Sequence, residues 1–350
     1  MTVAGTVRRW STRAALTGSG AGLTVAAFVA VIKGEARLAR RAISAHIKDL
    51  PPSGDGLYGR RPAEGSHRGS GKGSAKESQQ PLVLAVLGDS TGVGLGVQRA
   101  ADTPGALLAA ALSELAERPV RLVVFAVVGA ESRELPEQVD AAVAERPDAA
   151  VIMIGANDVT SRTKPAVSVA FQAEAVRRLR EVGAEVVVAT CPDLGTIRPI
   201  AQPLRRMARR WSRTMAAAQT VAVVEAGGRT VSLGSILGPT FARDRSLFSA
   251  DEFHPSAAGY AAACAVLLPS LADALGVWPA GSDRRRGSLR RETVRPIGEA
   301  AVRAAGRTGT EVQPADSAPD GASEGRVRRR RPSDLPTSEA GQQTARPATR

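Results

Sequence analysis

Residues 82–90 read L-V-L-A-V-L-G-D-S, and this stretch decides the expected fold. Six consecutive apolar residues indicate a strand that is buried on both faces, as in a parallel sheet covered by helices. The apolar run ends at Gly88, where polar residues begin. Ligands of such sheets bind outside the carboxyl ends of the strands, so we expect the chemistry directly after Gly88.

Four more apolar runs repeat this pattern, at residues 121–127, 150–154, 185–190 and 221–224. Stretches with Ala, Leu, Glu and Arg at helical spacing separate the runs, at 104–117, 134–145, 165–182, 203–219 and 256–275. The roughly 30 to 40 residues from run to run match the length of a βα unit. We therefore expect an α/β fold, a doubly wound three-layer α/β/α sandwich around a five-stranded parallel sheet.

The charge of the chain lies at its two ends. The 350 residues carry a net charge of +13, which by itself suggests nucleic acid or anionic lipid as a partner. However, residues 1–80 hold 13 Lys/Arg against 5 Asp/Glu, and residues 280–350 hold 15 against 9. Residues 81–279 hold 19 against 20 and are close to neutral. We therefore do not expect the folded centre to bind nucleic acid.

Composition divides the chain into four parts. Residues 1–50 are basic and apolar, and residues 51–80 form a linker that is rich in Gly and Ser and should be flexible. Residues 81–279 carry the apolar runs of the folded domain. Residues 280–350 are rich in Arg and Pro and are expected to be a disordered basic tail. The two cysteines exclude a disulfide scaffold and leave one bridge, Cys191 to Cys264, open.

The N-terminal part contains a candidate membrane segment. Residues 14–32 are 19 consecutive uncharged positions with basic residues on both sides. This length just reaches the ~20 residues that cross a bilayer. We expect an uncleaved membrane-associated helix, with the side of the membrane unspecified. A cleaved export signal, or an amphipathic helix that continues to Leu50 and lies on a membrane or on the protein, are the alternatives.

The polar stretch after the first run reads G-D-S-T-G-V-G-L-G over residues 88–96. A phosphate-binding Walker loop requires a lysine that is missing here. A G-x-G-x-x-G dinucleotide motif fails because its last glycine would fall on Val97 or Arg99. A nucleophilic Ser90 on a tight turn between strand and helix remains, with a plain βα turn as the alternative.

Two further candidates follow the second and third runs. Gly129 comes after the second run, and Asn157 after the third, in Gly155-Ala156-Asn157-Asp158. A glycine brings its backbone N–H close to a ligand, and an Asn amide donates a hydrogen bond. These are the donors that an oxyanion hole needs. A turn residue or a helix cap is the alternative reading of Asn157.

The third candidate block is Asp251-Glu252-Phe253-His254-Pro255, just before the last helix. A carboxylate three residues before a histidine can orient one ring nitrogen while the other accepts a proton. The remaining histidines, His46 and His67, lie in the basic N-terminal part and in the linker. His254 is therefore the only histidine of the folded centre and its candidate general base. A structural role is the usual alternative for a lone histidine, and Asp251 three residues earlier favours the base.

Taken together, these blocks resemble the SGNH hydrolases, also called GDSL esterases and lipases, over about residues 82–275. The family is named for Ser, Gly, Asn and His in four blocks, which Ser90, Gly129, Asn157 and His254 match in order. The resemblance implies a flavodoxin-like sandwich and no metal or cofactor. It also implies Ser90, His254 and Asp251 as catalytic residues, and Ser90, Gly129 and Asn157 as oxyanion donors. In α/β-hydrolases, which share G-x-S-x-G, the acid and the histidine lie well apart, so that family fits less well.

The resemblance implies an ester hydrolase that forms an acyl-enzyme on Ser90. An acyltransferase with the same residues, or an inactive membrane-tethered scaffold with the same fold, are the alternatives. The expected partner is a small acyl ester. Members of the family include lysophospholipases, lipases, thioesterases and carbohydrate acetylesterases, so the resemblance leaves the substrate open. A membrane-associated N-terminus would favour a lipid ester among these substrates.

Overall fold

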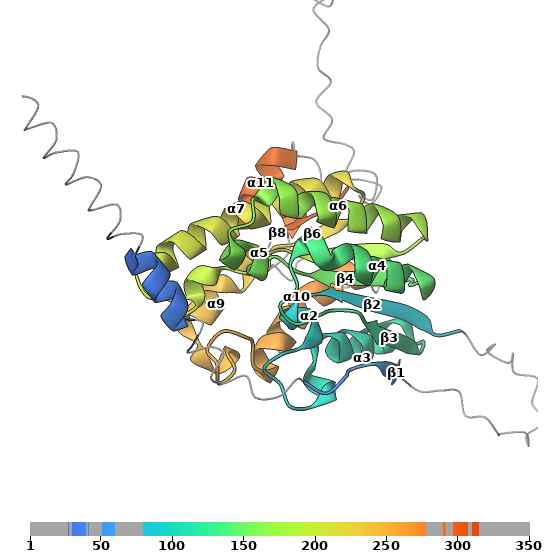
Figure 1. Cartoon of the computed structure of the whole chain (residues 1–350). Helices are drawn as coiled ribbons and strands as arrows, with labels where there is room; N and C mark the ends of the chain where they lie inside the picture. The colour runs from blue at the N-terminus through green and yellow to red at the C-terminus, as the bar shows by residue number, and fades with distance from the viewer. Residues whose placement is uncertain are drawn as a thin grey trace, which may run out of the picture.

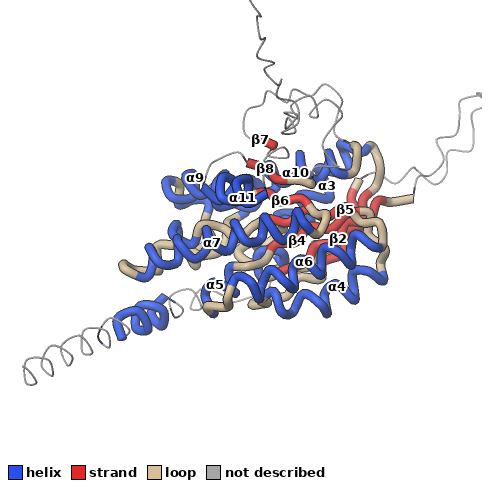
Figure 2. The backbone as a smooth tube through the Cα atoms, turned by 90° about the horizontal axis from the view of Figure 1, so that it is seen from above, coloured by secondary structure: helices blue, strands red, loops and turns tan. Residues whose placement is uncertain are grey.

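A computed structural model gives the structure of the chain. It describes residues 27, 30–39, 41, 51–59, 80–277, 290–291, 297–306 and 310–314. The predicted α/β sandwich is confirmed: helices cover both faces of one sheet (Figures 1 and 2). Most of the expected membrane segment, residues 60–79 of the expected linker and the end of the basic tail lie outside the described residues. The expectation of a flexible linker over residues 51–80 is wrong at its start, because Gly56–Tyr58 form a strand of the sheet.

Five parallel strands form the centre of the sheet, in the order β3-β2-β4-β5-β6. They are β3 (Val120–Val124), β2 (Leu82–Gly88), β4 (Ala149–Met153), β5 (Glu185–Ala189) and β6 (Arg229–Val231). This is the order of flavodoxin-like folds, in which the connections leave the first strand toward opposite sides. The crevice where the order reverses therefore lies at the end of β2, next to the ends of β3 and β4.

The expectation of a five-stranded, all-parallel sheet is wrong at both edges. Strand β1 (Gly56–Tyr58) pairs antiparallel with β3, and β8 (Thr310–Val312) pairs antiparallel with β6. Beyond β8, the short β7 (Arg290–Arg291) pairs parallel with it, so the described sheet has eight strands. These additions are two or three residues long, too short to produce an apolar run of their own.

The prediction that residues 221–224 form the fifth strand is also wrong. Residues 221–224 belong to the end of helix α7 (Leu204–Glu225), and the strand comes after the turn at Gly227. The run V-A-V-V resembles a strand, but Val223 faces the core as part of the apolar face of a helix. Strand β6 begins with Arg229, a buried cation that donates a hydrogen bond to Asp273 Oδ2 at 2.9 Å. Because a charged residue interrupts the apolar pattern, the sequence did not indicate a buried strand here.

Part of the expected disordered tail is folded. Helix α11 (Ile297–Gly306) packs against α7, and β8 extends the sheet. Ala301, Ala304 and Val312 are almost fully buried there. These few small apolar residues lie between arginines and glycines, so composition alone did not distinguish them from a solvated tail.

Alternate residues of β2 supply two cores. Leu84 and Val86 face one side of the sheet, and Ala85 and Leu87 face the other. Helices α3 (Pro104–Ala116) and α10 (Ala257–Ala274) cover the first side. The second side is covered by α4 (Leu135–Ala144), α6 (Pro165–Glu181) and the end of α7. Each fully buried Leu contributes roughly 1.5–3 kcal/mol, so these cores hold the strand ends in place.

A helix over residues 30–39, here called the N-terminal helix, lies beside α7 (blue in Figure 1). Its Ile32 and Ala39 are buried against the protein. The end of the expected membrane segment is therefore a protein contact. Among the described residues, α10 is apolar and long enough to cross a membrane, but it packs on the sheet and α3 as a core helix.

Candidate active site

Ser90 lies at the end of β2 as the first residue of the short helix α2 (Ser90–Val93). The turn requires Gly88, which has φ +132°, because a Cβ there would approach Met153 O to 1.9 Å. This close contact brings the end of β2 against the end of β4. The side chain of Asp89 caps α2 by accepting the Thr91 N–H at 2.9 Å. Ser90 is thus fixed by backbone geometry on a rigid strand end.

The structure brings Ser90, His254 and Asp251 into one hydrogen-bonded row. Ser90 Oγ lies 2.9 Å from His254 Nε2, and His254 Nδ1 lies 2.5 Å from Asp251 Oδ2. All three residues are buried to more than nine tenths. With Nδ1–H donating to Asp251, Nε2 carries the lone pair that accepts the Ser90 hydroxyl proton. The geometry is therefore that of a serine nucleophile with its base and the carboxylate that orients the base.

A tight loop before α10 holds the two partners of Ser90. The Ser249 N–H donates to the His254 carbonyl at 2.8 Å and closes the loop. Asp251 Oδ1 accepts from Ser249 Oγ and from the backbone N–H groups of Phe253 and His254, all within 2.8 Å. Burial raises the pKa of Asp251, but the hydrogen bonds from His254, Phe253 and Ser249 outweigh it and lower the pKa to about 2. Asp251 is therefore a carboxylate at any pH at which the protein works.

The oxyanion donors expected from the sequence lie at the ends of the neighbouring strands. Asn157 is in the short helix α5 (Ala156–Ser161) after β4, and its Nδ2 donates one hydrogen bond to Ala130 O at 3.0 Å. This bond aims the amide and leaves its second N–H available. Gly129, in the loop after β3, has φ +86° and lines the same cleft as Asn157 and His254. Among the described residues, neither the Ser90 nor the Gly129 N–H has an acceptor.

A buried carboxylate that the sequence left without a role connects these two donors. Asp158, fully buried beside Asn157, accepts from Ser132 N and Ser132 Oγ. It also accepts from Ser168 Oγ at 2.7 Å. Ser132 follows the loop of Gly129, so Asp158 ties that loop to the helix of Asn157. The G-x-N-D motif contained this residue, but nothing in the pattern indicated which backbone it would bind.

Two buried polar residues on helices also hold the site. Gln138 of α4 accepts the Gly88 N–H at 2.7 Å and donates to the Gly88 carbonyl at 2.9 Å. Tyr260 of α10 donates its hydroxyl to Leu95 O at 2.7 Å, which joins the helix after His254 to the loop after Ser90. Sequence reasoning missed both, because a single polar residue in a helix does not reveal whether its face is buried.

Asp89 lies beside the catalytic row in a water-poor position. Burial raises the pKa of Asp89 to about 6, and the hydrogen bond from Thr91 offsets only part of this effect. Near neutral pH the group therefore changes charge within the folded protein.

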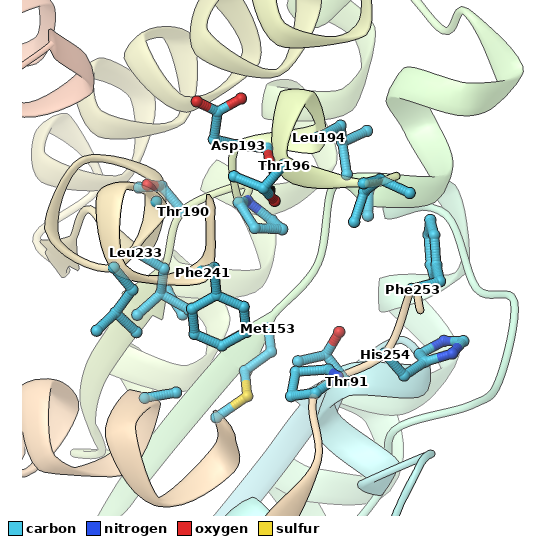
Figure 3. A pocket seen from close by; sticks show the side chains of 18 of the residues that line it. Thr91, Met153, Thr190, Asp193, Leu194, Thr196, Leu233, Phe241, Phe253 and His254 are labelled. Atoms are coloured by element: carbon cyan, nitrogen blue, oxygen red, sulfur yellow. Dashed lines mark hydrogen bonds between the residues drawn. The ribbon is translucent and has the colours of Figure 1, made fainter. Parts of the chain in front are cut away.

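Two hollows meet at His254. The first, the apolar pocket, has a volume of about 100 Å³. Leu233 of α8 (Leu233–Ile236) and Phe241 of α9 (Gly238–Arg243) line it across from Thr91 and His254 (Figure 3). The second hollow is called the cationic cleft because Lys33, Arg37 and Arg162 line it. It has a volume of about 800 Å³ and is also lined by Gly129, Asn157 and His254, and the N-terminal helix forms part of its lining. The candidate catalytic row therefore borders two spaces of different size and chemistry.

Cys191 and Cys264 are both buried free thiols, so the bridge that the sequence left open does not form. Burial raises the pKa of Cys264 to about 12. In the described part of the chain, no three His, Cys, Asp or Glu side chains are grouped to hold a metal ion.

Comparison with known proteins points in the same direction as the geometry. Residues 86–262 match the model of the GDSL-like lipase/acylhydrolase family. The GDSL-like esterase Rv1075c of Mycobacterium tuberculosis (strain ATCC 25618 / H37Rv) is 44% identical over 250 residues, which cover 70% of this chain and 77% of that protein.

Two matching solved structures share less sequence with this chain. TesA is 22% identical, with a TM-score of 0.46, and the match covers 55% of this chain and 99% of TesA. The psychrotrophic esterase EstA from Pseudoalteromonas sp. is 15% identical, with a TM-score of 0.46, over 55% of this chain and 98% of EstA.

Proposed function

Because this chain belongs to the GDSL-like lipase/acylhydrolase family and is a carboxylic ester hydrolase, we propose that it cleaves acyl esters through an acyl-enzyme on Ser90. The observation that carries the proposal is the hydrogen-bonded row of Ser90, His254 and Asp251. Each bond in this row is short enough for proton transfer or for orientation of the ring.

In the first half of the reaction, His254 Nε2 takes the proton of Ser90 while Oγ attacks the ester carbonyl carbon. The carbonyl oxygen becomes an oxyanion, which the N–H groups of Ser90 and Gly129 and the free N–H of Asn157 stabilise. Asp251 stabilises the positively charged ring of His254. His254 then gives its proton to the departing alcohol, and the acyl group stays on Ser90.

In the second half, water takes the place of the alcohol. His254 removes a proton from the water as it attacks the acyl carbonyl, and the same donors hold the second oxyanion. Ser90 leaves with the proton from His254, and a carboxylic acid is released. The protein returns to its starting state without a metal or a cofactor in the scheme.

The apolar pocket supports a short acyl group. Most of its lining residues are apolar, and it borders His254, whose Nε2 lies 2.9 Å from Ser90 Oγ. An apolar cavity of about 150 Å³ holds benzene, so about 100 Å³ fits a chain of about four carbons. We therefore propose acetyl to butyryl esters as the preferred substrates, with the alcohol in the wider cationic cleft.

The test is hydrolysis of p-nitrophenyl esters from acetate to palmitate by the full chain and by Ser90→Ala. We expect Ser90→Ala to lose at least about 10³-fold in kcat, because no other group in the row can form the acyl-enzyme. Ser53→Ala is the matched control, since Ser53 is exposed and lines neither hollow. Wild-type turnover by Ser90→Ala would overturn the proposal.

Two alternatives keep the same residues. An acyltransferase would pass the acyl group to a second alcohol, and product analysis with added glycerol separates this from hydrolysis. An inactive scaffold would not react with a fluorophosphonate probe, whereas an active Ser90 would be labelled. The hydrogen bond from Ser90 to His254 favours an active enzyme over the scaffold.

Membrane association through residues 14–32 remains a separate proposal. The uncharged length supports it, although Ile32 packs on the protein, so a membrane-inserted segment would end before this residue. The test is cell fractionation of the full chain and of Leu23→Lys. We expect the wild-type chain in the membrane fraction and less of the variant there, because a lysine in an apolar segment opposes insertion. Equal distribution of both would contradict the proposal.

A further inference from the structure

The N-terminal helix is docked on the enzyme by its apolar side. Ile32 is 3% exposed and Ala39 is 5% exposed. The residue before each of them, Val31 and Leu38, is exposed to solvent. The buried side joins a cluster with Ile200, Leu204 and other residues at the start of α7. The helix therefore has one defined face on the protein.

A hydrogen bond from Leu204 to Glu35 holds the helix against the start of α7. Glu35 accepts the backbone N–H of Leu204, the first residue of α7, at 3.1 Å. The residue before it, Pro203, offers no side-chain acceptor for this helix end. A carboxylate at a helix N-terminus satisfies a free N–H and opposes the positive end of the helix dipole. Glu35 thus caps α7 from a segment 169 residues away in sequence.

The side of the helix that is not docked contributes to the cationic cleft. Lys33 and Arg37 line the cleft together with Arg162, which stacks over the Trp211 ring at 5.4 Å. The described lining holds no carboxylate. Among the described residues none of these three cations is in an ion pair, whereas the nearby Arg209 is held by Asp193 at 3.3 Å.

We propose that the N-terminal helix is a wall of the substrate site, and that Lys33, Arg37 and Arg162 bind an anionic group on the alcohol part of the ester. The inference rests on the proposed function and names the substrate class of the same site. Asn157, Gly129 and His254 line the same cleft, so an ester held at Ser90 places its alcohol among these cations. Three cations that have no carboxylate partner within the described residues match a phosphate or carboxylate, which accepts charge-assisted hydrogen bonds.

The experiment compares two soluble esters that differ by one anion: 1-butyrylglycerol and 1-butyrylglycerol 3-phosphate. The full chain, Lys33→Gln/Arg37→Gln and Arg162→Gln are assayed with both. We expect the variants to raise KM for the phosphate ester about 10- to 100-fold more than KM for the neutral ester, because a hydrogen bond to a charged group is lost. Arg177→Gln on the far helix α6 is the matched control and should leave both KM values unchanged.

A second variant tests the wall itself. Ile32→Asp places a charge in the docked face and should release the helix, so we expect the same selective loss for the phosphate ester with the cations intact. Equal changes for both esters in Lys33→Gln/Arg37→Gln, or an unchanged phosphate-ester KM in Ile32→Asp, would overturn the inference. Neither outcome would touch the proposed function, which depends on Ser90→Ala.

A final arm identifies where the anion comes from. The same variants are assayed with 1-palmitoylglycerol 3-phosphate in phosphatidylcholine vesicles. A selective loss that is larger in vesicles than with the soluble phosphate ester indicates a lipid head group, and the reverse indicates a soluble phosphate ester. Absence of a selective loss with either substrate would overturn the inference.

Discussion

The apolar pocket and the cationic cleft share Leu194, Phe253 and His254 but differ in size and in chemistry. The pocket is small and mostly apolar, is lined in part by residues of the sheet, α8 and α9, and has Asp89 and Asp193 among its lining residues. The cleft is wide, collects three cations and takes one wall from residues 30–39, far outside the sheet. The difference teaches that the catalytic row is bordered by two parts of the chain that are built differently, one by interior packing and one by a docked surface helix. In our proposal, the first holds the acyl end of the ester and the second holds the alcohol end.

The largest effect is expected where the two hollows meet. Asp251→Asn should lower kcat by about 10⁴-fold on every ester, because the amide no longer fixes the His254 tautomer. Steady-state kinetics on neutral and phosphate esters measures this. Asp244→Asn, an exposed carboxylate on the same loop, is the control. A loss of kcat on only one kind of ester would contradict the assumption that His254 is the general base for both neutral and phosphate esters.

On the cleft side, Asn157→Ala should reduce kcat by about 10²–10³-fold, because an oxyanion donor acts mainly in the transition state. KM should change little, which distinguishes this loss from that of Lys33→Gln/Arg37→Gln. Gln98→Ala, an exposed amide that lines neither hollow, is the control. A raised KM with an unchanged kcat would make Asn157 a substrate-binding residue instead.

On the pocket side, Asp89 should make stability depend on pH. The pKa of Asp89 is about 6 in the folded chain against an ordinary 3.8, so its protonated form is favoured by folding. The contribution of the protonated Asp89 carboxyl to the free energy of unfolding is complete below about pH 4 and is lost as the pH rises through about 6. Asp89→Asn should therefore gain about 1–3 kcal/mol relative to wild type between pH 4 and pH 7. Urea unfolding at both pH values measures it, and an equal difference at both would contradict it.

The smallest effect concerns chain length. Phe241→Ala should enlarge the apolar pocket and shift the preferred ester toward longer chains, by about tenfold in the ratio of hexanoate to butyrate kcat/KM. Phe171→Ala on α6, outside both hollows, is the control. An unchanged ratio would place the acyl chain in the cleft and remove the division between the two hollows.

How much the sequence revealed differs between the two hollows as well. The apolar runs predicted four of the five central strands, and the order of the polar blocks placed Ser90, Gly129, Asn157 and His254 after them. These features are local, because each depends on a strand and the few residues that follow it. Their geometric assembly follows from parallel strands that end at one edge of the sheet.

The cleft wall and the supporting polar contacts depend on distant packing, which leaves no local pattern. Glu35 meets Leu204 only in the folded chain, and Asp158 was visible in its motif without a visible partner. Strand β6 escaped prediction for the same reason, since Arg229 is stable inside only because Asp273 and Gln313 bind it.

The pairing of β8 with β6 has a consequence for the order in which the protein becomes stable during synthesis. Every residue of the catalytic row has been synthesised once His254 is made, but the edge of β6 stays open until Thr230 pairs with Val312. An open edge strand is a template for association with other chains. Strand β8 therefore protects the edge of β6 from association with other chains. A chain that ends at residue 279 would contain the complete catalytic row, but its exposed β6 edge would favour aggregation.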